Sequence, residues 1–573
     1  MTYLIKINHL KIEKYLLITL IREQHTAYSP NYSINIMDTP LFDKWLEKNG
    51  LDRKPHQVEG VKFCVGNEKQ GRGGLIADEM GLGKTYVMLG TMIENPLKKT
   101  LIVLPLALLG QWYKIIKEKC DELNVFVFHS NITDKSFSPT HETPIEFKQE
   151  NPKKKGCKAY NRYQEYKTAK TYGDALKLGM TKADYRHDLK AGYIVNLMKK
   201  RIEEADVVIT TYGKTLTRKN EEEQDIPNLL YEYQWDRVIF DEAHHLRNAR
   251  TSRFIGVNKV NSKIRWLITG TPIQNRFSDF YALCENMGIK QETYKDDSAL
   301  TWIAKNYIIK RTKKDAGIEL PPVTIHTEKA DWKSEKEQEL SEQIHSLLSF
   351  TQVRKESGSI NPSISALGGQ SQSILPYLIR ARQSCIYPEL VKKAIEKYIK
   401  DGLIDDDPDF LEAISSSSKI DQVVNTIDER KRNGRNKLIF CHFRGEIDIL
   451  ESKIANLGLD VKTFDGRTSH NQRNEILENA CDVLILQIQT GCEGLNLQQF
   501  SEVYFVSPHW NPAVEDQAIA RCHRIGQESQ VDVFRFTMDN FGSTTINIEN
   551  HSNNLQDIKR DIAQDFNMKT ATQ

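Results

Sequence analysis

The sequence lacks the features that mark membrane, secreted and metal-binding proteins. It contains no run of 18 apolar residues, so no membrane span is expected. Its first residues mix charged side chains into an apolar stretch, unlike a secretory signal peptide. The nine cysteines include no C-x-x-C pair, which argues against a zinc module and a disulfide framework. We therefore expect an intracellular, soluble protein: nuclear if its source is eukaryotic, otherwise in the cytoplasm, a virion or a viral factory.

An excess of charge of one sign is also missing. The formal net charge of +2 over 573 residues creates no global field that would draw the protein onto nucleic acid. Such binding would have to use local basic clusters, which occur at residues 153–155, 310–314 and 430–437. Each cluster alone is more simply a solvated charged surface, because exposed Lys and Arg are common. Contacts from such clusters to phosphates would be independent of sequence and sensitive to salt.

Short apolar segments alternate with helical stretches in two separate series. The first series lies at 75–77, 100–105, 206–210, 238–240 and 266–269, and the second at 437–441, 461–464, 483–487, 503–507 and 531–536. Each segment ends at turn or charged residues, as buried strands do. This alternation predicts parallel sheets covered by helices on both faces. We expect an α/β protein with lobes at 46–290 and 415–545, separated by a linker and helical protrusion at 291–414.

The remaining segments differ in composition. Residues 130–200 are rich in Lys and Tyr and indicate a partly helical insertion on the surface of the first lobe. A patch rich in Ser, Gly and Gln at 357–373 is typical of a mobile loop. Residues 1–45 form a weakly patterned lead-in, and the polar tail at 546–573 is expected to fray. We hypothesise that Met37 is the natural start; an intact mass of the native protein that matches Met1 would refute this.

A glycine-containing loop follows the segment 75–77 and precedes a helical stretch. It reads Asp78-Glu79-Met80-Gly81-Leu82-Gly83-Lys84-Thr85. Such loops bind phosphate through backbone N–H groups at the positive end of a helix. Lys84 would reach the β- and γ-phosphates of ATP, and the Thr85 hydroxyl would bind Mg²⁺. Asp78 replaces the first glycine of the usual G-x-x-x-x-G-K-[ST] pattern, so the loop alone is also compatible with an ordinary turn before a helix.

Charged residues that complement this loop occur twice downstream. Asp241 and Glu242 follow the segment 238–240; Asp241 would hold Mg²⁺, and Glu242 would orient or deprotonate the attacking water. An Asp-Glu pair is also a common helix N-cap. Arg521 and Arg524 are three residues apart in a helical stretch, so we expect them to share one helix face. There they would stabilise charge on the transferred phosphoryl group, although a solvated basic face is the simpler interpretation of two arginines alone.

Together these motifs resemble the Swi/Snf-type ATPases of helicase superfamily two, from about residue 54 to residue 536. The segments that carry the resemblance are 54–57, 78–85, 241–244, 269–275, 310–313, 320–322, 382–388, 491–497 and, most specifically, HWNPAVEDQAIARCHRIGQ at 509–527. The resemblance implies two RecA-like lobes with ATP and Mg²⁺ between them. It also implies that Gln57 contacts adenine, and that Gly491, Gln517, Arg521 and Arg524 complete the site from the second lobe.

The resemblance further implies movement along duplex DNA by closure and opening of the lobes, usually without strand separation. Cys492 and Glu493 depart from the family, which usually has a glycine and a small apolar residue there. No chromatin-reader module is visible, so we do not predict a nucleosome role; the compact size suits a viral or mobile-element version. Two alternatives stay open: a strand-separating helicase, and a slow ATPase scaffold in a transcription or replication complex.

Overall fold

The computed structural model describes most of the chain from residue 38 onward. The described residues are 38–129, 141–219, 225–226, 228–350, 355–356, 359–360, 364–366, 374–402, 410–468, 472–473, 475–476, 479–491, 495–542 and 546–570. The hypothesised start at Met37 and most of the predicted mobile loop at 357–373 lie outside these residues. Within these ranges, no helix has both the length and the apolar character needed to span a bilayer.

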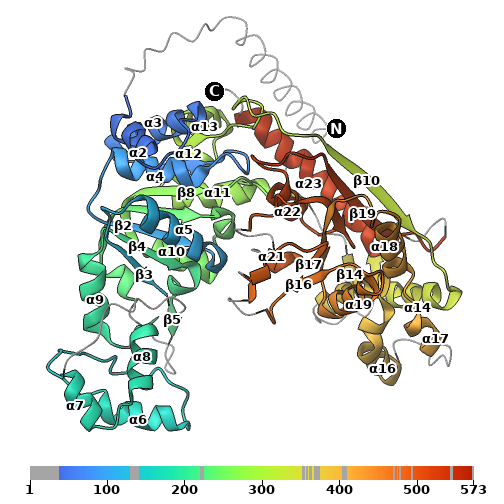
Figure 1. The fold of residues 1–573 in the computed structure, drawn as a ribbon, viewed down its shortest axis with the longest axis horizontal. Coiled ribbons are helices and arrows are strands. Elements are labelled where there is room, and N and C mark those ends of the chain that lie inside the picture. The colour runs from blue at the N-terminus through green and yellow to red at the C-terminus, as the bar shows by residue number, and fades with distance from the viewer. Residues whose placement is uncertain are drawn as a thin grey trace, which may run out of the picture.

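The first lobe is built on a seven-stranded parallel sheet in the order β3-β4-β2-β7-β8-β1-β9 (Figure 1). Its strands are β1 (Gly74–Ile76), β2 (Thr100–Leu104), β3 (Val125–Phe128), β4 (Val207–Thr211), β7 (Gln234–Asp241), β8 (Asn261–Ile268) and β9 (Ile308–Ile309). The short strand β9 lies beyond residue 290, the expected end of this lobe, and pairs with β1 at the sheet edge.

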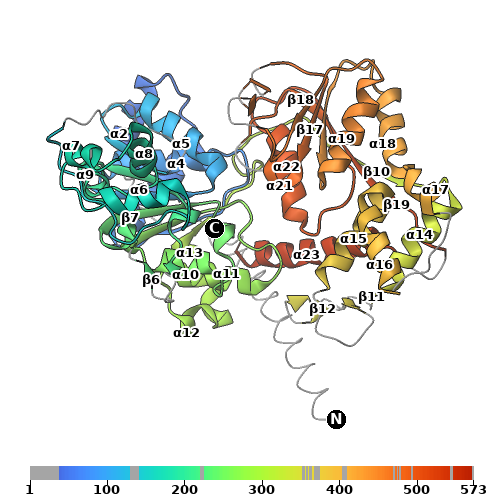
Figure 2. The ribbon, with the colours of Figure 1, turned by 90° about the horizontal axis from the view of Figure 1, so that it is seen from below.

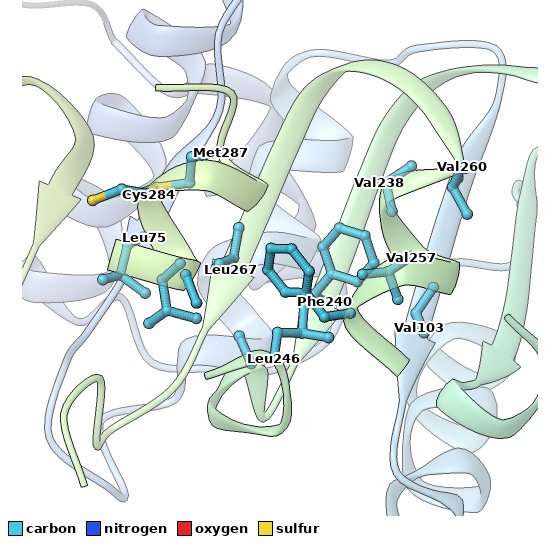
Figure 3. Close-up of a cluster of buried hydrophobic side chains, with 14 of the residues drawn as sticks. Leu75, Val103, Val238, Phe240, Leu246, Val257, Val260, Leu267, Cys284 and Met287 are labelled. Atoms are coloured by element: carbon cyan, nitrogen blue, oxygen red, sulfur yellow. The ribbon is translucent and has the colours of Figure 1, made fainter. Parts of the chain in front are cut away.

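Helices cover both faces of this sheet, so its strands are buried over most of their length. One face carries α2 (Pro40–Lys48), α3 (Pro55–Lys69), α4 (Lys84–Glu94) and α5 (Leu106–Lys119). The other carries α10 (Ser252–Asn258), α11 (Phe277–Asn286), α12 (Gln291–Tyr294) and α13 (Leu300–Tyr307). Figure 3 shows part of this second core, where Phe240 and Leu267 of neighbouring strands meet Val257 of α10. Burial of such side chains contributes about 1.5–3 kcal/mol each.

The second lobe contains a six-stranded parallel sheet in the order β10-β19-β18-β15-β17-β16. Its strands are β10 (Val323–Ala330), β15 (Asn436–Cys441), β16 (Val461–Phe464), β17 (Val483–Gln487), β18 (Phe500–Phe505) and β19 (Val531–Met538). Its described helices are α18 (Ser418–Glu429), α19 (Arg444–Ala455), α21 (Ile488–Gly491) and α22 (Pro512–Cys522). The predicted pair of RecA-like parallel-sheet lobes is confirmed. Strand β10 comes from the segment expected to be linker; as a half-exposed edge strand it has no continuous apolar run to reveal it.

A helical protrusion lies between the two sheets in the sequence and packs beside the second. It contains α14 (Glu335–Ser346), α15 (Leu375–Ile386), α16 (Lys392–Lys400) and α17 (Phe410–Ser415). Two short hairpins join it, β11 (Leu348–Phe350) with β14 (Ile364–Ala366), and β12 (Lys355–Glu356) with β13 (Ser359–Ile360). The first lobe has a further hairpin of β5 (Arg218–Lys219) and β6 (Asp225–Ile226).

The Lys- and Tyr-rich insertion follows β3, an edge strand of the first sheet, and projects away from the lobe (Figure 1). It contains α6 (Lys158–Tyr166), α7 (Tyr172–Lys177) and α8 (Lys182–Lys190), and α9 (Val195–Glu204) returns to the sheet. It has a small core of its own, in which Phe147, Tyr163 and Tyr166 are buried against one another. The insertion therefore folds around its own aromatic cluster.

The prediction that the polar tail frays is wrong. Residues 548–570 form one long helix, α23 (Ile548–Thr570). Its first turn is tied to the second lobe, where Glu549 and Lys419 form a buried ion pair. Farther along, Leu555 and Ile562 are buried in the core of the first lobe. Figure 2 shows α23 running from α15 toward α13. Composition suggested disorder because only one face of this helix is apolar, and that face is covered by both lobes.

Candidate active site

The glycine-containing loop connects β1 to α4 at the carboxyl edge of the first sheet. Gly81 and Gly83 have φ values of 91° and 81°, which glycine adopts without strain. A Cβ atom at Gly83 would lie 2.4 Å from Gln57 Nε2, so the loop also needs glycine there for space. Lys84 begins α4 and its Nζ donates to the carbonyl oxygens of Asp78 (2.9 Å) and Glu79 (3.3 Å). This is the cradle at a helix N-terminus that a phosphate group requires.

The two acidic side chains of the loop pair with basic residues of the segment that follows β9. Asp78 is fully buried and accepts hydrogen bonds from Nε (3.0 Å) and Nη2 of Arg311. Glu79 pairs with Lys313, at 3.1 Å between Oε1 and Nζ. These carboxylates therefore anchor the loop to the segment after β9, which explains why Asp78 can replace the usual glycine. Sequence reasoning noted this basic segment as a basic cluster and as part of the family resemblance, and did not foresee its pairing with the loop.

The remaining loop residues lie near one another. Gln57 Nε2 donates to the Leu82 carbonyl oxygen (3.2 Å), and His56 Nε2 lies 3.0 Å from the same oxygen. Met80 lies against Gly270, which follows β8. Thr85 lies in the first turn of α4 and is partly exposed. The contact of Gln57 with adenine and the bond of Thr85 to Mg²⁺ remain predictions.

Asp241 and Glu242 lie at the carboxyl end of β7, on the same sheet edge as the loop. Both oxygens of the Asp241 carboxylate accept a hydrogen bond: Oδ2 from Trp112 Nε1 (2.7 Å) and Oδ1 from the Glu242 backbone N–H (2.8 Å). Among the described residues outside glycine, Glu242 alone has a positive φ, at 49°. Such a conformation costs about 1–2 kcal/mol, and it turns the Glu242 side chain back toward the site.

The two carboxylates have opposite electrostatic surroundings. Burial and the adjacent charge of Glu242 raise the pKa of Asp241 to about 6. Burial also raises the pKa of Glu242, but the hydrogen bond and charge of His244, with Arg521 and Lys84, outweigh it and bring this pKa to about 2. Burial lowers the pKa of Lys84, against the opposing charges of nearby carboxylates. Glu242 is thus the more firmly ionised of the pair.

Polar contacts extend from Glu242 to the end of β8 and on to the second lobe. His244 Nδ1 lies 3.3 Å from Glu242 Oε2 and 3.4 Å from the Thr269 hydroxyl. Beyond Thr269, Gln274 Oε1 accepts a hydrogen bond from Asn511 Nδ2 of the second lobe (2.9 Å). Both segments belong to the motifs noted in the sequence, but their contact across the lobes was not predicted.

The prediction that Arg521 and Arg524 share one helix face is wrong. Helix α22 ends at Cys522, so Arg521 lies in its last turn and Arg524 beyond it. His523 is the C-cap of this helix, and its Nε2 lies 2.8 Å from the Pro321 carbonyl oxygen. Both arginines nevertheless approach the first lobe. Arg521 Nη2 lies 3.7 Å from Glu242 Oε1, and the Cβ of Arg524 would lie 3.5 Å from a Cβ placed on Gly81.

Gln517 and Gly491, the other residues expected from the second lobe, lie in helices α22 and α21. Gln517 is buried in α22, and its Nε2 atom finds no hydrogen-bond partner among the described residues. Gly491 is the last residue of α21. Cys492 and Glu493, which depart from the family pattern, lie outside the described residues.

The basic clusters are largely committed to contacts within the protein. Lys153 is buried in the insertion, 2.7 Å from Asp188 Oδ1. Arg435 and Lys437 of the cluster at 430–437 pair with Glu502, as does Arg430. With Arg311 and Lys313 holding the phosphate loop, most of these side chains stabilise the fold, instead of forming the solvated charged surface that was the simpler interpretation of each cluster.

Comparison with known proteins identifies the family. Residues 56–390 match the SNF2-related domain, and residues 418–526 match the helicase conserved C-terminal domain. The chain belongs to the SNF2 family. The predicted resemblance is confirmed, and this SNF2-family chain is a helicase-like, ATP-hydrolysing enzyme. Its residues fit a magnesium nucleotide, because the glycines open a phosphate cradle beside Lys84 and each Asp241 oxygen keeps a second lone pair.

The relatives of this SNF2-family chain differ greatly in length. A probable global transactivator of Orgyia pseudotsugata multicapsid polyhedrosis virus is 25% identical, over 88% of this chain and 89% of the viral protein. The CHD3-type chromatin-remodeling factor PICKLE of Arabidopsis thaliana is 24% identical over 84% of this chain, which spans 32% of PICKLE. The ATP-dependent DNA helicase DDM1 of the same plant is 21% identical over 85% of this chain and 59% of its own length. The SWI2/SNF2 ATPase core of Sulfolobus solfataricus, solved with dsDNA, aligns at 20% identity over 85% of this chain and 88% of that core, with a TM-score of 0.34.

Proposed function

We propose that this SNF2-family ATPase is a DNA-dependent translocase that moves along duplex DNA without separating its strands. The observation that carries the proposal is the approach of Arg521, in the second lobe, to within 3.7 Å of Glu242 in the first. Hydrolysis then depends on how the lobes are arranged, and a ligand that bridges them can control the rate. The relatives include proteins named as a DNA helicase and a chromatin-remodeling factor, which favours DNA as that ligand.

In the proposed site Lys84, Thr85 and Asp241 hold ATP and Mg²⁺. The bound magnesium nucleotide supplies the γ-phosphoryl group and the cation that offsets its charge. Glu242 is ionised at neutral pH and can accept a hydrogen bond from the attacking water. Although burial raises the pKa of Glu242, the hydrogen bond and charge of His244 hold it below its usual value, so we assign Glu242 to orienting the water rather than to removing a proton. Arg521 and Arg524 stabilise the charge that develops on the transferred group.

Coupling between nucleotide and DNA would use the series of polar contacts that connects Glu242 to the second lobe. His244 connects this carboxylate to Thr269, and the segment after Thr269 reaches Asn511 through Gln274. A change at the phosphate can therefore alter a contact between the lobes. Two discrete arrangements of such a contact are what a stepping motor requires.

The insertion is the part of the chain whose charge best suits a DNA backbone. Residues 141–194 contain twelve Lys and Arg against seven Asp and Glu, a formal charge of +5, while the rest of the chain carries −3. Two of the seven acids, Asp184 and Asp188, are buried against basic partners. Lys154, Lys155 and Lys158 are exposed. We assign these lysines to phosphate contacts, which give affinity without sequence preference.

The proposal is tested by the ATPase rate without nucleic acid and with single-stranded DNA, duplex DNA or RNA. We expect duplex DNA to stimulate most. Lys84→Ala should nearly abolish turnover, and Arg524→Ala should lower kcat by on the order of 10³-fold while ATP still binds. Equal rates with and without duplex DNA would contradict the proposal.

Movement is measured separately from hydrolysis. A translocase displaces a third strand from a triplex during ATP turnover but leaves a forked duplex paired. Unwinding of the fork without triplex displacement would favour a strand-separating helicase, and slow turnover with neither activity would favour a scaffold.

A further inference from the structure

Asp241 accepts hydrogen bonds on both oxygens of its carboxylate and on its backbone carbonyl oxygen. Trp112, in α5, donates its indole N–H to Asp241 Oδ2 at 2.7 Å, and the Glu242 backbone N–H reaches Oδ1 at 2.8 Å. The Tyr212 hydroxyl donates to the Asp241 carbonyl oxygen at 2.8 Å. Trp112 is 1% exposed and Asp241 is 7% exposed. Three donors from three segments therefore fix both the side chain and the backbone of this residue.

Fixing both oxygens has a specific consequence for the orientation of the carboxylate. The terminal torsion of an aspartate side chain is broad, so an unrestrained carboxylate samples many orientations. A backbone N–H on one oxygen limits this motion only partly, because the group can still tilt about that bond. A second donor on the other oxygen removes the remaining freedom. Each oxygen keeps a second lone pair for another ligand.

We propose that Trp112 is a positioning residue of the nucleotide site, which holds Asp241 in the orientation that Mg²⁺ binding requires. The inference rests on the proposed role of Asp241 as the metal-binding carboxylate. Magnesium demands near-ideal octahedral geometry, so a misoriented carboxylate binds it poorly. Loss of a hydrogen-bonding partner of a metal ligand typically weakens metal binding by about 10–100-fold. We expect an effect near the lower end, because the Glu242 N–H stays in place.

The chain offers a closely matched control. Trp266, in the same lobe and packed in the same core as Trp112, is buried and donates its indole N–H to the Glu68 carboxylate at 2.9 Å. Glu68 belongs to a buried pair with Arg237, away from Asp241. Trp266→Phe therefore removes the same kind of hydrogen bond and the same ring volume as Trp112→Phe. If Trp112 had a purely structural role, the two variants would show the same change in affinity for the nucleotide.

The test measures binding of a non-hydrolysable ATP analogue by calorimetry, with and without Mg²⁺. Trp112→Phe should weaken binding about tenfold in Mg²⁺ and leave binding without Mg²⁺ unchanged, whereas Trp266→Phe should alter neither. Should Trp112→Phe fold poorly, benzothienylalanine at position 112 keeps the ring shape and removes only the N–H. It should give the same loss. Wild-type affinity in Mg²⁺ with benzothienylalanine at 112 overturns the inference.

A second readout needs no nucleotide. The indole ¹⁵N–H signal of Trp112 should shift in Asp241→Asn, because the charge on its acceptor is removed. The Trp266 signal should stay in place. An unmoved Trp112 signal overturns the inference. If Asp241→Asn keeps the full Mg²⁺ dependence of analogue binding, the assignment of Asp241 as the metal ligand fails, and the inference fails with it. If instead duplex DNA does not stimulate wild-type hydrolysis, only the proposed translocase function fails.

Discussion

Replacing Arg311 should weaken ATP binding although its guanidinium pairs with the Asp78 carboxylate. This side chain donates to both oxygens of Asp78, which is fully buried at the start of the loop. The backbone on both sides is paired as well, with Ala77 N donating to Ile309 O (2.7 Å) and Glu79 N to Arg311 O (2.8 Å). Arg311→Ala therefore leaves the backbone ladder intact and a buried carboxylate without its cation.

The size of the effect follows from these contacts. Hydrogen bonds to charged groups contribute about 1.5–3 kcal/mol each, and breaking a buried ion pair by removing one partner costs about 3–5 kcal/mol. The loop can relax toward solvent, so we expect about 3 kcal/mol. If all of this free energy holds the loop in its phosphate-binding shape, ATP affinity falls by roughly 100-fold, since about 1.4 kcal/mol corresponds to tenfold.

The assay is ATP affinity by calorimetry for Arg311→Ala, Asp78→Asn and the double variant. Asp78→Asn removes the charge, so it should restore part of the affinity lost in Arg311→Ala. Lys314→Ala, an exposed neighbour, is the control and should bind ATP normally. Additive effects of the two substitutions, with no recovery in the double variant, would show that the pair does not shape the loop.

Three further perturbations probe other parts of the molecule. Replacing Lys154, Lys155 and Lys158 by Gln should weaken duplex binding and lower the slope of log affinity against log salt by about 0.9 per lost contact. Replacing the exposed Lys44, Lys69 and Lys117 by Gln is the control and should leave both unchanged. An unchanged slope in the first variant would exclude the insertion from DNA contact. Leu555→Ala and Ile562→Ala should each lower the free energy of unfolding by about 2–5 kcal/mol and together speed hydrogen exchange in α23. Asn554→Ala is the control and should do neither. Equal hydrogen-exchange protection of α23 in the double variant and the control would mean that the first lobe does not hold this helix. Burial raises the pKa of Glu446 from 4.5 to about 7, so the stability that wild type has beyond Glu446→Gln, measured by urea unfolding, should fall by up to about 3 kcal/mol as pH rises through this range. Taking the difference between the two proteins cancels the opposing titration of His442 and His509, and a difference that rises with pH would refute this.

Several features were predictable because they depend on neighbours in the chain. The glycines at 81 and 83 indicate a left-handed turn, and Lys84 after them indicates a phosphate-binding helix start. Both are local matters of backbone freedom and helix geometry. The apolar segments before Asp78 and Asp241 predict strands of one parallel sheet, whose carboxyl ends share an edge. The two halves of the first-lobe site follow from this rule alone.

The failed predictions concern segments whose structure depends on distant partners. The tail 548–570 is polar overall, and its contacts with both lobes, through Glu549, Leu555 and Ile562, stabilise it as a helix. Helix α22 ends before Arg524, where His523 contacts Pro321, a residue 202 positions away in the chain. The basic side chains at 430–437 could not be assigned to Glu502 or to DNA without knowing which carboxylates lie beside them.

The sequence by itself determined the enzyme class, the two parallel-sheet lobes and the phosphate-binding loop, because these are encoded in short spacings of glycine, charge and apolar residues. Only the tertiary structure decided which side chains lie at the candidate active site and which stabilise the fold. Asp78 and Glu79 turned out to anchor the loop, Trp112 to hold Asp241, and Arg521 to meet Glu242 from the other lobe. The physical reason is that burial and pairing change the role of a charged group, and both are set by contacts between residues far apart in the chain.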